Sequence, residues 1–355
     1  MKSIDEKQVE TGPEAPDGGA TRTAVRKEVL GEDDAGSRVD RVLARLLPTV
    51  PRTRLLRLLR RGEVRLNGKR VGGDARVAAG DVLRVPPVRL EAPPAVEGAA
   101  AEGGGAASKR VPPRLVEAVE ASIVHQDERL LVIDKPSGIA VHGGSGIGFG
   151  VIEALRASRP DETLELVHRL DRDTSGCLLI ARRRSTLRSL HALLREEAFD
   201  KRYLALLRGK WDLGTKLIDA PLRTDLRVGG ERTVRVAANG KPAQTQIRPV
   251  QFFGRLATLV EVRLLTGRTH QIRVHAAYAG HPVAGDEKYG DEAFNEQLRG
   301  FGLKRLFLHA HSIGFTDPQR QVDVALSAPL PDDLKQVLDA LSQRAGKLRP
   351  ASVNT

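Results

Sequence analysis

The sequence predicts an α+β protein in which a small basic module, residues 23–90, precedes a larger module with a mixed sheet, residues 114–343. Two observations predict this organisation. Residues 91–113 are rich in Ala, Gly and Pro and lack apolar periodicity, which is typical of a flexible linker. Beyond them, strand-like and helix-like runs alternate, and two of the strands are long and of hairpin type. We expect the polar ends, residues 1–22 and 344–355, to be disordered.

The composition indicates a polyanionic partner. The 355-residue chain has a formal net charge of +12, and such an excess favours nucleic acid. An anionic membrane surface, or a solvated arginine-rich surface without a partner, would give the same charge. No apolar run approaches the roughly 18 residues of a membrane span, and the start of the sequence has no apolar signal region, so we expect a cytoplasmic protein. The single cysteine, Cys177, lies in an apolar run and is expected to be buried.

The small module begins with two predicted helices. Residues 38–47 and 52–61 place Val and Leu at helical spacing, and Gly62 ends the second helix. An Asn-Gly pair at 67–68 predicts a tight hairpin turn between two short strands. A further strand is expected within residues 81–86.

Basic side chains crowd the second helix and the hairpin of this module. A surface of one sign attracts phosphates through counterion release, although a solvated amphipathic helix is an alternative explanation. The module resembles the S4 RNA-binding domain in RVDRVLARLL, in RTRLLRLLRRGEVRLNGKRV and in AAGDVLRVP, and this resemblance implies that it binds RNA. The candidate RNA-binding residues are Arg52, Arg54, Arg57, Arg60, Arg61, Asn67, Lys69 and Arg70.

In the larger module, the pattern of apolar residues predicts strands and helices in alternation. Strands are expected at Ser122–Val124, Leu130–Ile133, Gly176–Ala181, Lys201–Leu207, Gln244–Pro249, Leu256–Leu265 and Arg305–His309. Helices are expected at Gly150–Arg156, Ser185–Glu196, His270–Ala279 and Pro331–Ala345.

Four stretches of the larger module concentrate unusual polar residues beside strand-like runs. Loops in such places commonly carry functional sites. The stretches are DKPSGIAVHGGSG (134–146), HRLDRDTSG (168–176), DKRYLALLRG (200–209) and TGRTHQIRVH (266–275).

Asp171, in the second stretch, is a candidate for chemistry. Neighbouring arginines favour the charged form of a carboxylate, and an ionised aspartate at the edge of a site can act as a nucleophile or a base. Thr174 and Ser175 can bond to nearby backbone, and Gly176 permits a close turn. A purely structural network of Asp and Arg side chains explains this pattern equally well.

Two further stretches contain candidate functional residues, each of which has both a functional and a structural interpretation. Arg268 lies near the expected start of a helix, where anions bind well, and Arg273 could pair with a carboxylate from another loop or form a structural ion pair. Tyr203 is either a core aromatic or a ring that stacks on a nucleobase at the edge of a site.

Other chemistries find little support in the sequence. No H-E-x-x-H motif is present, which disfavours a zinc site. The glycine-rich residues 143–146 lack the G-K-[ST] ending of a P-loop, and no G-x-S-x-G occurs. Asp171 and Asp173 are too close in sequence, and without a Glu partner, to suggest a glycosidase pair.

Taken together, the order and spacing of the four polar stretches resemble the RluA-type family of pseudouridine synthases over most of residues 120–330. The resemblance implies a catalytic domain with a mixed, mainly antiparallel sheet, preceded here by the S4-like domain. It implies that Asp171 is the catalytic aspartate, that Tyr203 packs on the target base and assists proton removal, and that Arg273 pairs with the aspartate. The expected substrate-binding residues are Arg169, Ile272, Arg268 and His168.

The activity that the resemblance implies is isomerisation of specific uridines to pseudouridine in 23S ribosomal RNA. The uridine is flipped out of its stack, its N1–C1′ bond is broken, and C5 is joined to C1′. No cofactor or metal is expected. The alternative is a non-catalytic RNA-binding ribosome-assembly factor on the same fold. The sequence leaves the target uridines and the oligomeric state open, with a monomer as the default.

Overall fold

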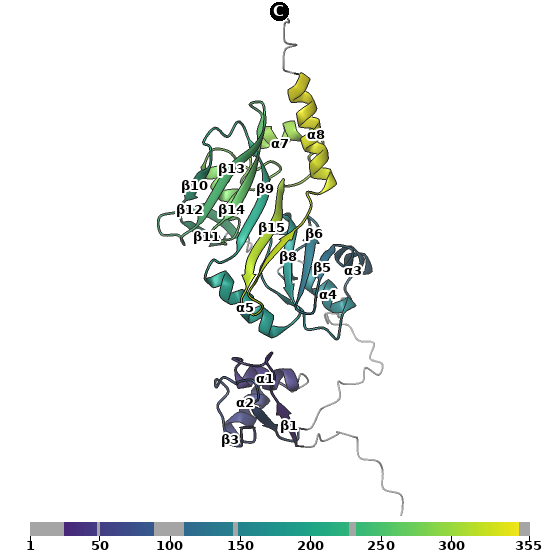
Figure 1. The fold of residues 1–355 in the computed structure, drawn as a ribbon, viewed down its shortest axis with the longest axis vertical. Helices are drawn as coiled ribbons and strands as arrows, with labels where there is room; N and C mark the ends of the chain where they lie inside the picture. The colour runs from purple at the N-terminus through teal and green to yellow at the C-terminus, as the bar shows by residue number, and fades with distance from the viewer. Residues whose placement is uncertain (1–24, 48–49, 89–109, 145–147, 227–231, 348–355) are drawn as a thin grey trace, which may run out of the picture. The chain divides into compact units, whose positions relative to one another are not determined.

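A computed structural model divides the chain into two compact units, residues 1–105 and 106–355 (Figure 1). The residues that it describes are 25–47, 50–88, 110–144, 148–226 and 232–347. The predicted tail 1–22 and most of the predicted linker and C-terminal tail lie outside the described residues. Helix α3 (Pro113–Glu120) begins at the last residue of the predicted linker, and helix α8 (Asp332–Lys347) extends into the predicted C-terminal tail.

The N-terminal unit combines two helices with an antiparallel sheet of strand order β1-β4-β2-β3. Leu55, Leu58 and Leu59 of its second helix are buried at helical spacing, which leaves the arginines for the other face. Asn67 and Gly68 have φ angles of 50° and 77°, the geometry of the predicted tight hairpin turn. The elements of this unit are β1 (Arg26–Val29), α1 (Val39–Leu46), α2 (Arg52–Arg61), β2 (Arg65–Leu66), β3 (Lys69–Arg70) and β4 (Val82–Val85).

The C-terminal unit is built on a mixed, mostly antiparallel sheet, which confirms the predicted fold class. Eight of its strands are hydrogen-bonded in the order β10-β13-β14-β9-β15-β8-β6-β5. In addition, β16 pairs with β15 and β7 pairs with β8. Its strands are β5 (Ile123–Gln126), β6 (Leu130–Lys135), β7 (Glu165–Leu166), β8 (Ser175–Ala181), β9 (Asp200–Arg208), β10 (Lys216–Asp219), β13 (Gln244–Phe253), β14 (Ala257–Leu264), β15 (Leu308–Asp317) and β16 (Val322–Ser327). A separate hairpin consists of β11 (Leu222–Leu226) and β12 (Arg232–Val236).

Helices cover both faces of this sheet, because alternate residues of the buried strands point in opposite directions. Leu131 of β6 packs into the cluster that holds Leu155 of α4, whereas its neighbour Val132 packs with Leu190 of α5. A third cluster joins α7 and α8 to the sheet. The helices not yet located are α4 (Val151–Ser158), α5 (Arg184–Arg195), α6 (Gln271–Tyr278) and α7 (Glu292–Arg299). No helix in the described parts of the chain is both long and apolar enough to cross a membrane.

The strand predicted at Arg305–His309 is displaced toward the C-terminus. Strand β15 begins only at Leu308, where its register with Ala205 of β9 starts, and it continues for ten residues. Its pairing with β8 is parallel and brings Ala310 beside Gly176. This one parallel contact joins the two halves of the sheet, and it fixes the loop that precedes β8.

Gly176 is expected to be indispensable at this junction. Its φ is 109°, and a Cβ there would overlap the backbone carbonyl of Ala310. Gly176→Ala should therefore lower the free energy of unfolding by more than the ~1–3 kcal/mol of a strained backbone conformation alone, as measured by denaturant unfolding. Gly148→Ala is the control, because no atom of the described residues other than its chain neighbours lies within 4 Å of its added Cβ. Equal stabilities of the two variants would refute the argument.

Candidate active site

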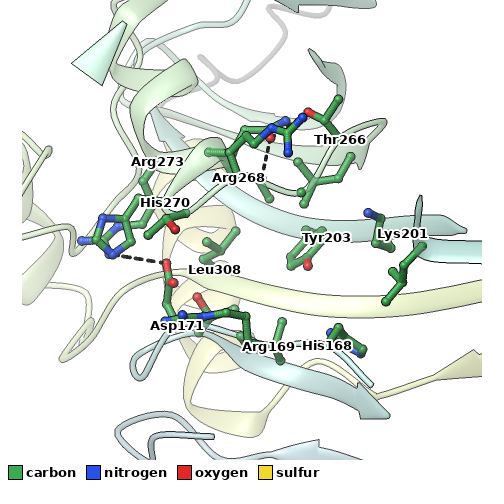
Figure 2. Close-up of a pocket in the computed structure, with 18 of the residues that line it drawn as sticks. His168, Arg169, Asp171, Lys201, Tyr203, Thr266, Arg268, His270, Arg273 and Leu308 are labelled. Carbon is green, nitrogen blue, oxygen red and sulfur yellow. Dashed lines mark hydrogen bonds and ion pairs between the residues drawn. The ribbon is translucent and has the colours of Figure 1, made fainter. Parts of the chain in front are cut away.

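A cavity of about 560 Å³ lies where the loop before β8, strand β9 and the start of α6 meet. Its size is typical of a small-ligand pocket. Figure 2 shows Asp171 near His270 and Arg273 at one end, Tyr203 and Leu308 farther along, and Lys201 at the other end. The cavity is lined by every residue for which catalysis or substrate binding was predicted: Asp171, Tyr203, Arg273, Arg169, Ile272, Arg268 and His168.

The Asp171 carboxylate faces two nitrogen-bearing side chains, that of Arg273 in α6 and that of His270, which immediately precedes this helix. Arg273 Nη1 lies 3.7 Å from Oδ2 of Asp171, and His270 Nε2 lies 3.8 Å from the same oxygen. One fifth of the Asp171 side chain is exposed, so the carboxylate is held at one side and accessible from the cavity.

The loop that carries Asp171 is braced by Lys135 at the end of β6. Lys135 is fully buried, and its Nζ donates to the carbonyl oxygens of Pro136, Ile139 and Arg172 at 2.7–2.9 Å. Burial lowers the pKa of Lys135 to about 7, against the opposing charges of Asp173 and Asp171. The DKPSG stretch therefore supports the site from behind and does not line the cavity.

Arg273 is itself fixed by a carboxylate that the sequence analysis did not single out. Asp286 accepts hydrogen bonds from Arg273 Nε at 2.7 Å and Nη2 at 2.8 Å, and its side chain is fully buried. Burial alone would raise the pKa of Asp286, but the hydrogen bonds and charge of Arg273, with two backbone N–H groups, hold that pKa below its ordinary value. The remaining nitrogen of the guanidinium, Nη1, is thereby directed at Asp171.

The floor of the cavity is apolar. Tyr203 of β9 and Ile272 of α6 are buried, at 8% and 4% exposure, and Leu308 lies beside them. Burial, followed by the nearby charge of Asp171, raises the pKa of the Tyr203 phenol. Tyr203 is therefore a neutral ring at physiological pH, suited to packing against another flat group.

Cations predominate in the part of the cavity around Lys201, where Arg268 and the carboxylate of Glu197 lie close enough to influence its charge. Lys201 of β9 has a lowered pKa, chiefly because it is buried. Arg268 donates from Nε to the Pro242 carbonyl at 3.0 Å, and Arg169 is exposed at the rim. His168 differs from these, because its Nε2 accepts the backbone N–H of Leu179 at 3.1 Å and burial lowers its pKa to about 4. It anchors the start of the loop.

The eight candidate RNA-binding residues lie on the other unit, where most are exposed on α2 and the β2–β3 hairpin. Within the described residues, Arg57 and Lys69 form no ion pair, whereas Arg52 contacts Asp40 at 3.4 Å. Asn67 is occupied structurally, since its amide bonds to Asp81 and to the backbone of Val82, both at 2.8 Å. Among the described residues, no group of three His, Cys, Asp or Glu side chains could hold a metal ion.

Comparison with known proteins identifies the family. A family model described as RNA pseudouridylate synthase matches residues 129–278. The chain is 49% identical over 322 residues to the ribosomal large subunit pseudouridine synthase C of Pasteurella multocida (strain Pm70). The aligned residues cover 90% of this chain and 95% of that protein. The chain belongs to the RNA pseudouridylate synthase family. The protein of the same name from Escherichia coli (strain K12) is 47% identical over 323 residues, covering 90% and 97% of the two chains.

Solved structures show the same catalytic fold as this synthase. Human RNA pseudouridylate synthase domain containing 4 superposes with a TM-score of 0.54 at 26% identity, and covers 64% of this chain and 96% of its own. Human RNA pseudouridylate synthase domain containing 1 gives 0.51 at 28% identity, with coverages of 63% and 94%. Enzymes of this family are isomerases, since pseudouridine and uridine have the same atoms.

Four supporting residues of this synthase escaped the residue-by-residue prediction. Lys135 lies in the first polar stretch and His270 in the fourth, but the sequence indicates a site role for neither. Asp286 and Tyr289 lie in the GDEKYG segment beyond α6. Tyr289 is one of only three tyrosines in the chain, a rarity that could have drawn attention to it.

Proposed function

We propose that this synthase converts specific uridines of 23S ribosomal RNA to pseudouridine, with Asp171 as the group that acts on the ribose. The observation that supports this proposal is the placement of the Asp171 carboxylate at one end of a cavity whose floor is apolar and whose other end is mainly cationic. The relatives named above act, by their names, on the large ribosomal subunit. The geometry suits a flipped nucleotide, with a flat base on the floor and phosphates among the cations.

The reaction rearranges bonds without a co-reactant. The uridine is first extruded from its stack at a cost of a few kcal/mol. Asp171 then either attacks C1′ or removes a proton from the sugar, and the N1–C1′ bond breaks. The base turns within the cavity and C5 joins C1′. On the first route this step breaks the Asp171–C1′ ester, and on the second route Asp171 returns its proton to the sugar. C5 then loses a proton while N1 gains one. Both routes require a carboxylate that is directed at the ribose. The ion pair of Arg273 with Oδ2 is proposed to hold Asp171 in that direction.

The target base is proposed to lie between Tyr203 and Ile272, the two buried apolar surfaces of the floor. The place of the buried Tyr203 ring in the cavity lining supports packing on the base, and the raised pKa of its phenol weighs against removal of the C5 proton by a phenolate. Arg169 is proposed to hold the uridine out of its stack, and Arg268 to bind phosphate beside the start of α6. Substrate binding by His168 stays a prediction, and its imidazole already accepts a hydrogen bond from the backbone N–H of Leu179 in β8.

The basic N-terminal unit is proposed to bind RNA around the target. Arg57→Gln and Lys69→Gln, made singly, should each weaken RNA binding and reduce the slope of log affinity against log salt by about 1. The rate at saturating enzyme should not change. Lys27→Gln is the control, because Lys27 is exposed on β1, at the opposite edge of the same sheet from β3. An unchanged salt slope in both test variants would remove these residues from the RNA-binding surface.

The proposed function is tested by incubating the purified protein with unmodified 23S ribosomal RNA and mapping pseudouridine at each position. We expect a small set of modified uridines that is absent without the protein. Binding of this RNA without any pseudouridine would instead favour the alternative, a non-catalytic assembly factor on the same fold.

A further inference from the structure

His270 occupies an unusual position beside the proposed catalytic carboxylate. It is the N-cap residue of α6, and its backbone is left-handed, with φ 53° and ψ 19°. Residues other than Gly are uncommon in this conformation, and His, like Asn and Asp, is among those enriched in it. The conformation turns the imidazole back from the helix toward the cavity, where Nε2 approaches Asp171 Oδ2 at 3.8 Å (Figure 2).

The hydrogen bonds around His270 favour one position for the proton of its neutral imidazole. Nδ1 lies 2.8 Å from the Tyr289 hydroxyl, and that hydroxyl oxygen already accepts the backbone N–H of Val234 at 2.9 Å. Because the phenol accepts the Val234 N–H, its own O–H is available to donate, which favours Nδ1 as the acceptor of this hydrogen bond. The proton of the neutral imidazole is then on Nε2, the nitrogen that faces Asp171.

The two neighbours of Asp171 converge on the same oxygen. His270 Nε2 and Arg273 Nη1 both have Oδ2 as their closest carboxylate oxygen, at 3.8 and 3.7 Å. Such separations are longer than hydrogen bonds, but bonds in unliganded active sites often shorten when substrate binds. We propose that His270 is a positioning residue, an inference that rests on the proposed function. Its Nε2–H and the Arg273 guanidinium together hold Oδ2 of Asp171, which leaves Oδ1 to act on the ribose.

Tyr289 couples the two members of this clamp. Its hydroxyl bonds to His270, the Arg273 guanidinium lies 5.1 Å from its ring centre, and its backbone N–H donates to Asp286, which fixes Arg273. The acceptor side of the hydroxyl is bound to Val234 of the β11–β12 hairpin. Tyr289 thus contacts His270 through its hydroxyl and Arg273 through its ring, and its backbone supports the Asp286 carboxylate that fixes Arg273.

The matched variants His270→Asn and His270→Gln separate positioning from simple folding. Asn is well tolerated in the left-handed conformation, and its short amide can meet Tyr289 but not Asp171. The Gln amide can place an N–H near the former Nε2. In single-turnover assays on 23S ribosomal RNA, we expect His270→Asn to lower the rate about 10²-fold at unchanged RNA affinity, and His270→Gln to lie between it and the wild type.

Tyr289→Phe completes the kinetic test. It removes the O–H that orients His270, so it should slow the wild type but cause no further loss in the His270→Asn background, because the two act as one unit. A wild-type rate for His270→Asn, or equal losses in His270→Asn and His270→Gln, would overturn the proposal.

A spectroscopic measurement decides the proposal independently of turnover. In ¹⁵N-histidine spectra, the signal absent from His270→Asn should show a neutral ring protonated at Nε2, and Tyr289→Phe should shift it. A ring protonated at Nδ1 would overturn the positioning role. If the wild type formed no pseudouridine while this tautomer was observed, the proposed function would fail and the described orientation of His270 would stand.

Discussion

Replacing Asp171 by Asn is expected to abolish pseudouridine formation while RNA binding stays largely intact. The amide has the shape of the carboxylate, but it can neither attack C1′ nor take a proton from the sugar. The rate should fall by at least about 10⁴-fold, the upper end of what a positioned acid–base group contributes. Because C5 loses its proton in the reaction, release of tritium from RNA labelled at C5 of uridine measures the loss directly.

Asp173→Asn is the matched control for this prediction. Asp173 is in the same loop, carries the same group and pairs with Arg172 at 3.2 Å, but its side chain does not line the cavity. Its loss should change turnover little. If Asp171→Asn kept its activity, or if Asp173→Asn were equally impaired, the assignment of the reactive carboxylate would be wrong.

Local features of the fold were predictable from the sequence because they depend on residues close together in the chain. The apolar spacing from Arg52 to Arg61 and the glycine after it predict α2 with its observed bounds. The Asn-Gly pair at 67–68 predicts the tight turn, and the apolar run before Ala181 predicts the end of β8. Each of these signals comes from backbone preference or from side-chain alternation over a few residues.

Features that depend on distant pairing were not predictable in the same way. The parallel contact of β15 with β8 joins residues more than 130 positions apart, and no local pattern encodes it. The short edge strand β10 and the separate β11–β12 hairpin are stabilised by tertiary contacts and were not predicted. In the site, a resemblance supplied Asp171, Tyr203 and Arg273, but residues that act through others carry no such signal. Nothing in the sequence pairs Lys135 with the carbonyl of Arg172, or Asp286 with Arg273.

Asp286→Asn should impair both stability and turnover. Asp286 is fully buried and Arg273 is 11% exposed, so neutralising the carboxylate leaves the buried guanidinium with only the more distant carboxylate of Asp171, 3.7 Å away. Removing one partner of a buried ion pair typically costs about 3–5 kcal/mol, and denaturant unfolding at neutral pH should show a loss of this order. A freed Arg273 would no longer direct Nη1 at Asp171, so turnover should fall more than RNA affinity.

The pH dependence of this destabilisation provides a sharper test. Since the pKa of Asp286 is held below its ordinary value in the folded protein, the stability that the carboxylate contributes is fully present above the ordinary value, about 4. It is lost as the pH falls through the folded-state pKa. The stability difference between wild type and Asp286→Asn should therefore be large at pH 7 and shrink in acid. Glu296→Gln, at an exposed pair with Arg299, should show little difference at any pH. A gap for Asp286→Asn that did not narrow in acid would mean that its ionised carboxylate is not what holds Arg273 in place.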